Sequence, residues 1–235
     1  MHALFIIDQR MLAVGGQQHG MVALDAAGAP VHDALLWNDT RSADAATELV
    51  TEMGGPQACA EAVGSVLVAS FTATKLRWLR DHRPDDAARV ESVLLPHDYV
   101  SWHLTGRRTQ PFTDRGDASG TGYFDARTST WRHDLAAAAL GHDVALPTIV
   151  PDGSAAYEDG VVVAGGTGDN MGAALGLGLG PGDVVVSIGT SGVASAVTEA
   201  PVADGTGTVT GFADATSCSP PTGAPEVANV VGGTP

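Results

Sequence analysis

The chain has 235 residues, enough for one large domain or two modest ones. It carries 27 acidic and 12 basic residues, a formal net charge of -15, and so lacks the basic surface that a nucleic-acid binder needs. The same charge argues against binding to an anionic membrane, although backbone N–H groups and a metal ion still allow an acidic protein to bind a nucleotide.

The apolar patches and the two cysteines indicate in which cellular compartment we expect the protein. Residues 1–7 hold a short apolar patch that Asp8 interrupts, without a basic leader, and charged residues punctuate every later hydrophobic stretch. Cys59 and Cys218 have no metal-ligand spacing, so we expect reduced thiols, with Cys59 in the core. We therefore expect a cytoplasmic protein with no nucleic-acid or membrane partner.

In the first part of the chain, hydrophobic periodicity predicts alternating strands and helices. A buried strand at 12–15 runs into the glycine-rich turn GQQHG. The further predicted elements, in chain order, are a strand at 21–24, an amphipathic helix at 42–53 ended by Gly54-Gly55-Pro56, a helix at 71–82 ended before Pro84, a strand at 93–95 and a helix at 97–104 closed by Gly106.

The second part contains two strand-turn signals in tandem. After a polar loop at 113–125, the predicted elements are a helix at 134–140, a strand at 161–164, the turn GGTGDN, a helix at 171–179, a strand at 184–188, the turn GTSG and a returning strand at 193–197. Strands that alternate with helices indicate an α/β architecture. Residues 217–235 are rich in Pro, Gly and Ser, so we expect little fixed structure there.

Asp169 is the first candidate for chemistry. It follows a strand and the glycines of GGTGDN and stands at the start of a helix, where an α/β protein commonly binds its ligand. A carboxylate in such a cleft can accept a proton from a hydroxyl that attacks a phosphoryl group. The residues alone leave a second interpretation open, because Asp is also a frequent helix cap.

Three further sites carry similar alternatives. GTSG offers backbone N–H groups and two hydroxyls to a phosphate, but the same spacing suits an ordinary hairpin turn. His19 beside Gln18 could bond a polyol or serve the structure. Asp39 and Arg41 are interpreted chiefly as a structural ion pair. The eight histidines fall without metal-binding spacing, so we predict no protein-held metal ligands.

Seven segments in order resemble the FGGY carbohydrate kinases: GGQQHG, LLWNDTRS, FTATKLRWL, LLPHDYVSWHLTG, TDRGDASGTG, GGTGDN and SIGTSG. The QHG turn is similar to that of the xylulokinase branch. The resemblance implies an actin/hexokinase-like (ribonuclease H-like) α/β kinase fold, with an incomplete first domain and the start of the second. It further implies residues 1–180 as the N-terminal sugar-binding domain, 181–216 as the start of the C-terminal ATP-binding domain, and 217–235 as a disordered tail.

The resemblance also implies a reaction and its residues. ATP, with Mg²⁺ on the nucleotide, phosphorylates D-xylulose to D-xylulose 5-phosphate. Asp169 matches the catalytic base, and Gln18, His19 and Asn170 match the sugar contacts. The second phosphate loop is matched by Gly189, Thr190, Ser191 and Gly192. The oligomeric state stays open, a homodimer included.

The chain also departs from the family pattern. Family members begin with a strand and a DxGT-type phosphate loop, whereas Asp8 in FIIDQR is followed by no Gly-Thr, so the metal role is not carried onto it. We therefore expect a truncated kinase with weak or no activity and an exposed edge on its first sheet. The alternatives are a non-catalytic sugar-binding module, a kinase for another ketose or polyol, and a non-functional gene product.

Overall fold

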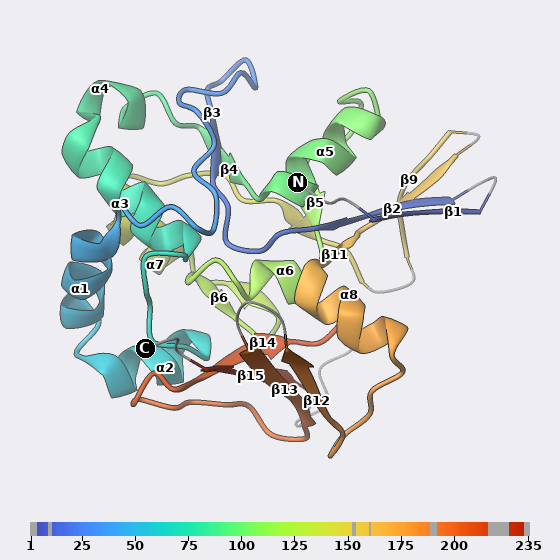
Figure 1. Cartoon of the computed structure of the whole chain (residues 1–235). Helices are drawn as coiled ribbons and strands as arrows, with labels where there is room; N and C mark the ends of the chain where they lie inside the picture. Colours follow the sequence, from blue (N-terminus) through green and yellow to red (C-terminus); the bar gives the residue numbers. More distant parts are fainter. Residues whose placement is uncertain are drawn as a thin grey trace.

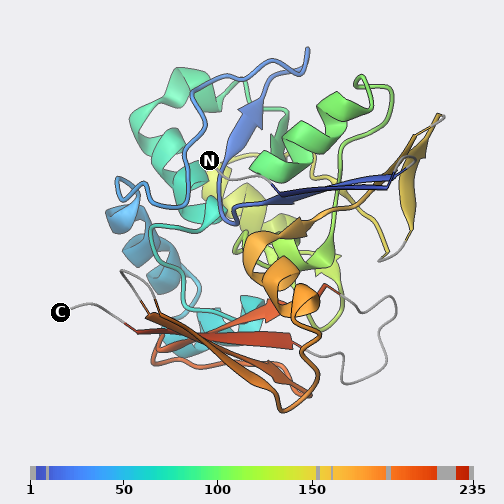
Figure 2. The ribbon, with the colours of Figure 1, turned by 45° about the vertical axis from the view of Figure 1, so that its right-hand side comes forward.

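The structure is a computed structural model that describes residues 4–8, 11–151, 154–159, 161–188, 192–215 and 226–232. A group of helices lies beside a mixed sheet, and a second sheet lies below both, with helix α8 (Asp169–Gly176) between the two sheets (Figures 1 and 2). In the described part of the chain, no helix is long and apolar enough to cross a membrane.

The first sheet positions the glycine-rich turn. Its five strands are β1 (Leu4–Asp8), β2 (Met11–Gly16), β9 (Ala155–Glu158), β10 (Val162–Ala164) and β11 (Thr167–Gly168). β10 and β11 both run parallel to β2, and β1 runs antiparallel to it. Leu4–Asp8 pair with residues 11–15 of β2, and β1 is then the terminal strand of the sheet, so the expectation of an exposed edge stays a prediction.

The predicted helices are confirmed, with ends shifted by at most three residues. The helices are α1 (Ala43–Glu52), α2 (Pro56–Val63), α3 (Thr72–His82), α4 (Pro84–Ala87), α5 (Pro96–Leu104), α6 (Arg115–Ala118), α7 (His133–Leu140) and α8. The sequence missed α2: Gly54-Gly55-Pro56 does end α1, but Pro56 also begins a new helix, since its fixed φ suits the first turn. Gly55, at φ 101°, supplies the change of direction between them.

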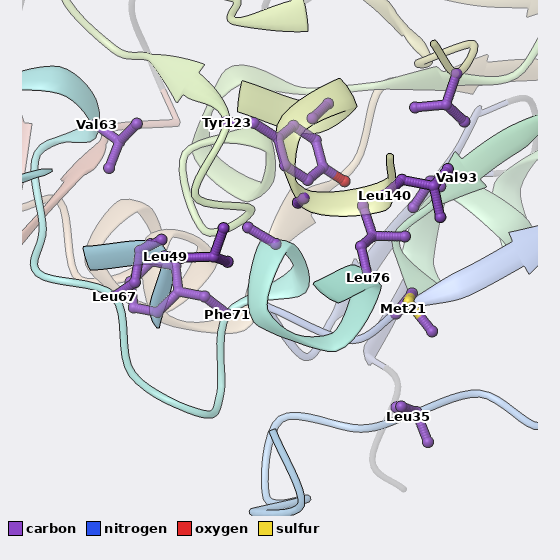
Figure 3. Packing of buried hydrophobic residues seen from close by; sticks show 14 of the residues in the cluster. Met21, Leu35, Leu49, Val63, Leu67, Phe71, Leu76, Val93, Tyr123 and Leu140 are labelled. Atoms are coloured by element: carbon purple, nitrogen blue, oxygen red, sulfur yellow. The ribbon is translucent and has the colours of Figure 1, made fainter. Parts of the chain in front are cut away.

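The main core lies among α1, α3 and α7 and the short strands beside them (Figure 3). Leu76 and Leu79 of α3 are fully buried, and Phe71 precedes them at the start of the helix. Cys59 is fully buried and free, as predicted, while Cys218 lies outside the described residues. The buried apolar face of α3 is therefore the one that its sequence periodicity indicates.

Residues 113–125 correct the sequence analysis. We expected a polar loop, yet residues 112–124 are buried throughout and contain α6. Short paired strands surround it: β3 (Val22–Leu24) with β4 (Ser92–Leu94), β5 (Phe112–Thr113) with β8 (Thr148–Ile149), and β6 (Phe124–Asp125) with β7 (Thr130–Trp131). Arg115, Asp114, Ser119 and Thr121 have hydrogen-bond partners inside the fold, which hydropathy alone does not reveal.

The second sheet contains β12 (Val184–Ile188), β13 (Gly192–Thr198), β14 (Val209–Ala213) and β15 (Glu226–Gly232), in the order β12-β13-β15-β14. The hairpin predicted at 184–197 is confirmed by the antiparallel β12–β13 pair. The prediction of little structure over 217–235 is wrong for Glu226–Gly232, because this strand lies between β13 and β14. Backbone pairing to two neighbours outweighs its weak hydrophobic pattern.

Candidate active site

Asp169 stands at the junction of the first sheet and α8. Strand β10 leads into Gly165 and Gly166, β11 returns alongside the end of β2, and α8 begins at Asp169 with Gly168 in the N-cap position. Gly166 has φ +84°, and a Cβ there would lie 2.5 Å from the carbonyl oxygen of Val14. Glycine is therefore needed for the turn to pass this close to β2.

The Asp169 carboxylate faces solvent-reachable space on two sides. A cavity of about 590 Å³ is lined by Gly165 to Asp169, by Asp114 and by the first turns of α8. A second cavity of about 490 Å³ is lined by Gln17, Trp37, Asn38, His97 and again Asp169. Partial desolvation raises the pKa of Asp169, although its Oδ1 accepts a hydrogen bond from Asn170 N at 2.8 Å.

These observations bear on the two interpretations of Asp169. Gly168 occupies the cap position and Asp169 is the first helical residue, with its side chain exposed between the cavities. A carboxylate in this place is near the positive end of the α8 dipole and open to a ligand from either side. The Asp169 carboxylate is therefore accessible from both cavities.

Gln18 and Asn170 are brought together with Asp169. Gln18 is 2% exposed, its Nε2 donates to Gly116 O at 3.2 Å, and its Oε1 accepts from Asn170 Nδ2 at 3.4 Å. A Cβ on Gly168 would lie 2.7 Å from Gln18 Cγ, so the amide packs tightly against the turn before Asp169. The predicted sugar contacts Gln18 and Asn170 thus form one connected amide pair beside the carboxylate.

His19 points into the protein interior. Its Nδ1 lies 2.6 Å from Gly120 O, and its ring centroid lies 4.7 Å from that of Phe71 and 5.6 Å from that of Phe212. Burial lowers the pKa of His19 to about 4, so the ring is neutral at pH 7. His19 also has φ +67°, a left-handed backbone that the flanking glycine turn accommodates.

The remaining predicted residues are less central. Asp39 and Arg41 form the predicted ion pair, with Oδ1 2.9 Å from Nε, at the partly exposed rim beside Asn38. The pKa of Asp39 is lowered by its contacts with Arg41, which outweigh the effect of burial. Of the predicted phosphate loop, Gly189, Thr190 and Ser191 lie outside the described residues, and Gly192 begins β13.

Two buried polar groups were missed. His97, Asp98, Asp114 and Asp117 form a cluster behind the glycine turn, and all four are at most 2% exposed. Lys75 of α3 is fully buried, donates from Nζ to Ala69 O (2.6 Å) and Ser70 O (2.7 Å), and has its pKa lowered by burial to about 8. The available signal was the set of ionisable residues inside otherwise apolar or glycine-rich segments.

The fold and the site together identify the class of protein. The family model described as the FGGY family of carbohydrate kinases, N-terminal domain, matches residues 6–176. The chain belongs to this family. The match contains the glycine turn, Asp169 and all of the first sheet except Leu4 and Phe5, and it confirms the resemblance inferred from the seven segments.

Individual relatives are xylulose kinases. The chain is 51% identical over 214 residues to the xylulose kinase of Streptomyces coelicolor and 48% identical over 218 residues to that of Streptomyces rubiginosus. The alignments cover 87% of this chain and 44% of each relative, so the chain spans less than half the length of these relatives.

A solved structure agrees with these matches. The xylulose kinase from Bifidobacterium adolescentis superimposes with a TM-score of 0.86 and 38% identity, over 94% of this chain and 52% of that one. The predicted α/β kinase fold is thereby confirmed.

Proposed function

We propose that this chain carries the sugar side of a xylulokinase-type kinase, which transfers the terminal phosphoryl group of ATP to D-xylulose and releases D-xylulose 5-phosphate and ADP. The proposal rests on one observation above all. Asp169 lies at the start of α8, behind a glycine turn and between two cavities, in a chain 51% identical to a xylulose kinase. The identity favours D-xylulose over other sugars, and the site supplies the base.

The chemistry that Asp169 would perform is a proton transfer. The terminal hydroxyl of the sugar lies beside the carboxylate, its oxygen attacks the terminal phosphorus of ATP, and its proton passes to Asp169. The bond between that phosphorus and the bridging oxygen breaks, and ADP leaves with the electron pair. The raised pKa of Asp169 favours this transfer, because it makes the carboxylate a stronger base.

Gln18 and Asn170 would orient the sugar. Their amides already bond each other at 3.4 Å, so little side-chain entropy is lost when a polyol replaces or extends that contact. Asp169→Asn is expected to preserve this amide pair while removing the base. Gln18→Ala is expected to weaken sugar binding with a smaller effect on the chemical step.

The nucleotide would bind in the glycine-lined cavity. Its turn brings backbone close to a bound phosphate, and Asp114 and Asp169 are the carboxylates in its wall. Asp114 caps α6, accepting from Gly116 N at 2.8 Å, so Asp169 is the more available oxygen ligand. Mg²⁺ fits this donor set, since it takes one or two carboxylates and the phosphates of its nucleotide, and it would supply charge neutralisation at the transferred group. We further propose a boundary near residue 180, with 181–216 contributing to the ATP side.

The experiment that tests the proposal separates binding from turnover. Calorimetric titration of the full chain with D-xylulose, other ketoses and polyols ranks the sugars, and ³¹P NMR after incubation with ATP and Mg²⁺ identifies any phosphorylated product. We expect D-xylulose to bind most tightly and to be the sugar that gains phosphate. Binding without a phosphorylated product would favour the non-catalytic sugar-binding module, and tighter binding of another sugar would reassign the substrate.

A further inference from the structure

A buried group of charges lies directly behind the turn that carries Asp169. The Nδ1 atom of His97 lies 2.6 Å from Asp117 Oδ2 and 3.0 Å from Asp98 Oδ1, and its Nε2 lies 3.4 Å from Asp114 Oδ1. The side chains of His97 and Asp117 are fully buried, and those of Asp98 and Asp114 are 1% and 3% exposed. Three carboxylates therefore face one imidazole without access to water.

The carboxylates depend on His97 for compensation. Both oxygens of Asp117 and Oδ1 of Asp98 are buried and accept no hydrogen bond from any group in the described part of the chain. A buried carboxylate without hydrogen bonds either takes up a proton or needs a nearby positive charge, and burial raises the pKa of Asp117 to about 7. His97 supplies the positive charge: burial alone would lower its pKa, but Asp117 and Asp98 outweigh burial and raise the pKa of His97 well above the ordinary value.

The other ring nitrogen of His97 reaches the turn itself. Nε2 lies 3.0 Å from the carbonyl oxygen of Gly165, and a ring charged on both nitrogens must donate there. The contact is close on both sides: a Cβ on Gly166 would lie 2.6 Å from His97 Cδ2, and one on Gly16 would lie 2.7 Å from His97 Cβ. His97 therefore packs closely against both β2 and the turn that precedes Asp169.

We infer that His97 is a positioning residue for Asp169: its Nε2–H holds the Gly165 carbonyl, and its ion pairs with Asp98 and Asp117 fix the ring in that orientation. The inference rests on the proposed function for its catalytic consequence. The ion pairs matter because α5 carries His97 and Asp98, while α6 carries Asp117, so the ring connects these two helices to the turn. His97 also lines the second cavity together with Asp169.

Two double variants separate the hydrogen bond from the charge. Asp117→Asn removes one of the three buried carboxylates from both variants alike, so the two differ only at position 97: His97→Gln/Asp117→Asn keeps an N–H for Gly165, whereas His97→Leu/Asp117→Asn has none. Both are expected to unfold cooperatively. We expect D-xylulose affinity within about threefold of wild type for the Gln variant and at least about tenfold weaker for the Leu variant.

Hydrogen exchange over residues 164–170 provides a second readout that needs no sugar. We expect faster exchange of this segment in the Leu variant than in the Gln variant. If wild type binds no D-xylulose, the proposed function fails, but the exchange comparison still decides the role of His97. Equal exchange and equal affinity in the two folded variants would overturn the inference.

A cation in the cluster is the competing account, because ligand atoms of His97, Asp98 and Asp117 lie within 4.8 Å of one another. Wild-type protein stripped with EDTA and then given Mn²⁺ or Zn²⁺ alone tests it. We expect an unchanged melting temperature. A stabilisation that Asp117→Asn abolishes would assign the cluster to a metal ion and overturn the ion-pair account.

Discussion

The buried ion pair between Arg115 and Asp214 gives a sharp test of how the second sheet is attached. Nη1 of Arg115 in α6 lies 2.6 Å from Oδ1 of Asp214, directly after β14, and their side chains are 5% and 8% exposed. Arg115 also donates to Ala126 O at 2.9 Å. Asp214→Ala would leave this guanidinium buried without its counter-charge, at a cost of roughly 3–5 kcal/mol.

That loss of unfolding free energy is measurable by scanning calorimetry. For a chain of 235 residues it corresponds to a fall in melting temperature of about 6–20 °C. The control is Asp159→Ala, which breaks the Arg108–Asp159 pair of 2.7 Å between side chains 67% and 63% exposed, and which we expect to change the melting temperature by about 1 °C or less. Arg115→Met/Asp214→Ala should recover much of the loss. An Asp214→Ala variant that melts like the control would refute the packing of β14 on α6.

Two further predictions concern the turns around the site. The pKa of His19 falls from 6.5 in the unfolded chain to about 4 in the folded one. Between these two pH values the unfolded chain binds a proton on His19 that the folded chain does not bind. The free energy of unfolding should therefore drop as the pH falls from 6.5 towards 4, by at most about 3 kcal/mol. Urea unfolding across this window should show a shallower pH dependence in His19→Asn than in wild type, and identical slopes would contradict the burial of the neutral ring. Gly166→Ala, at φ +84° and against Val14 O, should lose at least about 1 kcal/mol, whereas Gly176→Ala, with open space around its Cβ, should be neutral or stabilised. Equal denaturation midpoints for the two variants would show that the turn does not approach β2 closely.

Sequence patterns within one segment, such as an apolar face or a terminal proline, predicted the helices that those same residues determine. The helix at 71–82 has a continuous apolar face and a proline after its end, and α3 spans Thr72–His82. By contrast, residues 113–125 look like a polar loop because their hydropathy is low. They can be buried only because residues distant in sequence pair with them, as Asp214 does in its ion pair with Arg115. Glu226–Gly232 likewise gains its strand structure from neighbours on both sides, which the sequence pattern does not contain.

The site shows the same division. Asp169 could be predicted, because a strand, a glycine turn and a helix start are all local features, and Gln18 followed from the resemblance. The contacts of His97 could not be predicted, since Asp117 and Gly165 become its neighbours only when α5, α6 and the turn meet in space. A lone histidine in a predicted helix carries no sequence signal of its counter-charges.

The most direct test of the central claim is ADP release coupled to D-xylulose, measured on the purified chain with ATP and Mg²⁺. Asp169→Asn is compared with Asp159→Asn, which changes an exposed carboxylate that lines neither cavity. The account predicts weak but measurable sugar-dependent ADP release by wild type and by Asp159→Asn, and its loss in Asp169→Asn, which should still bind D-xylulose. Sugar-dependent turnover that survives unchanged in Asp169→Asn would contradict the assignment of Asp169 as the base.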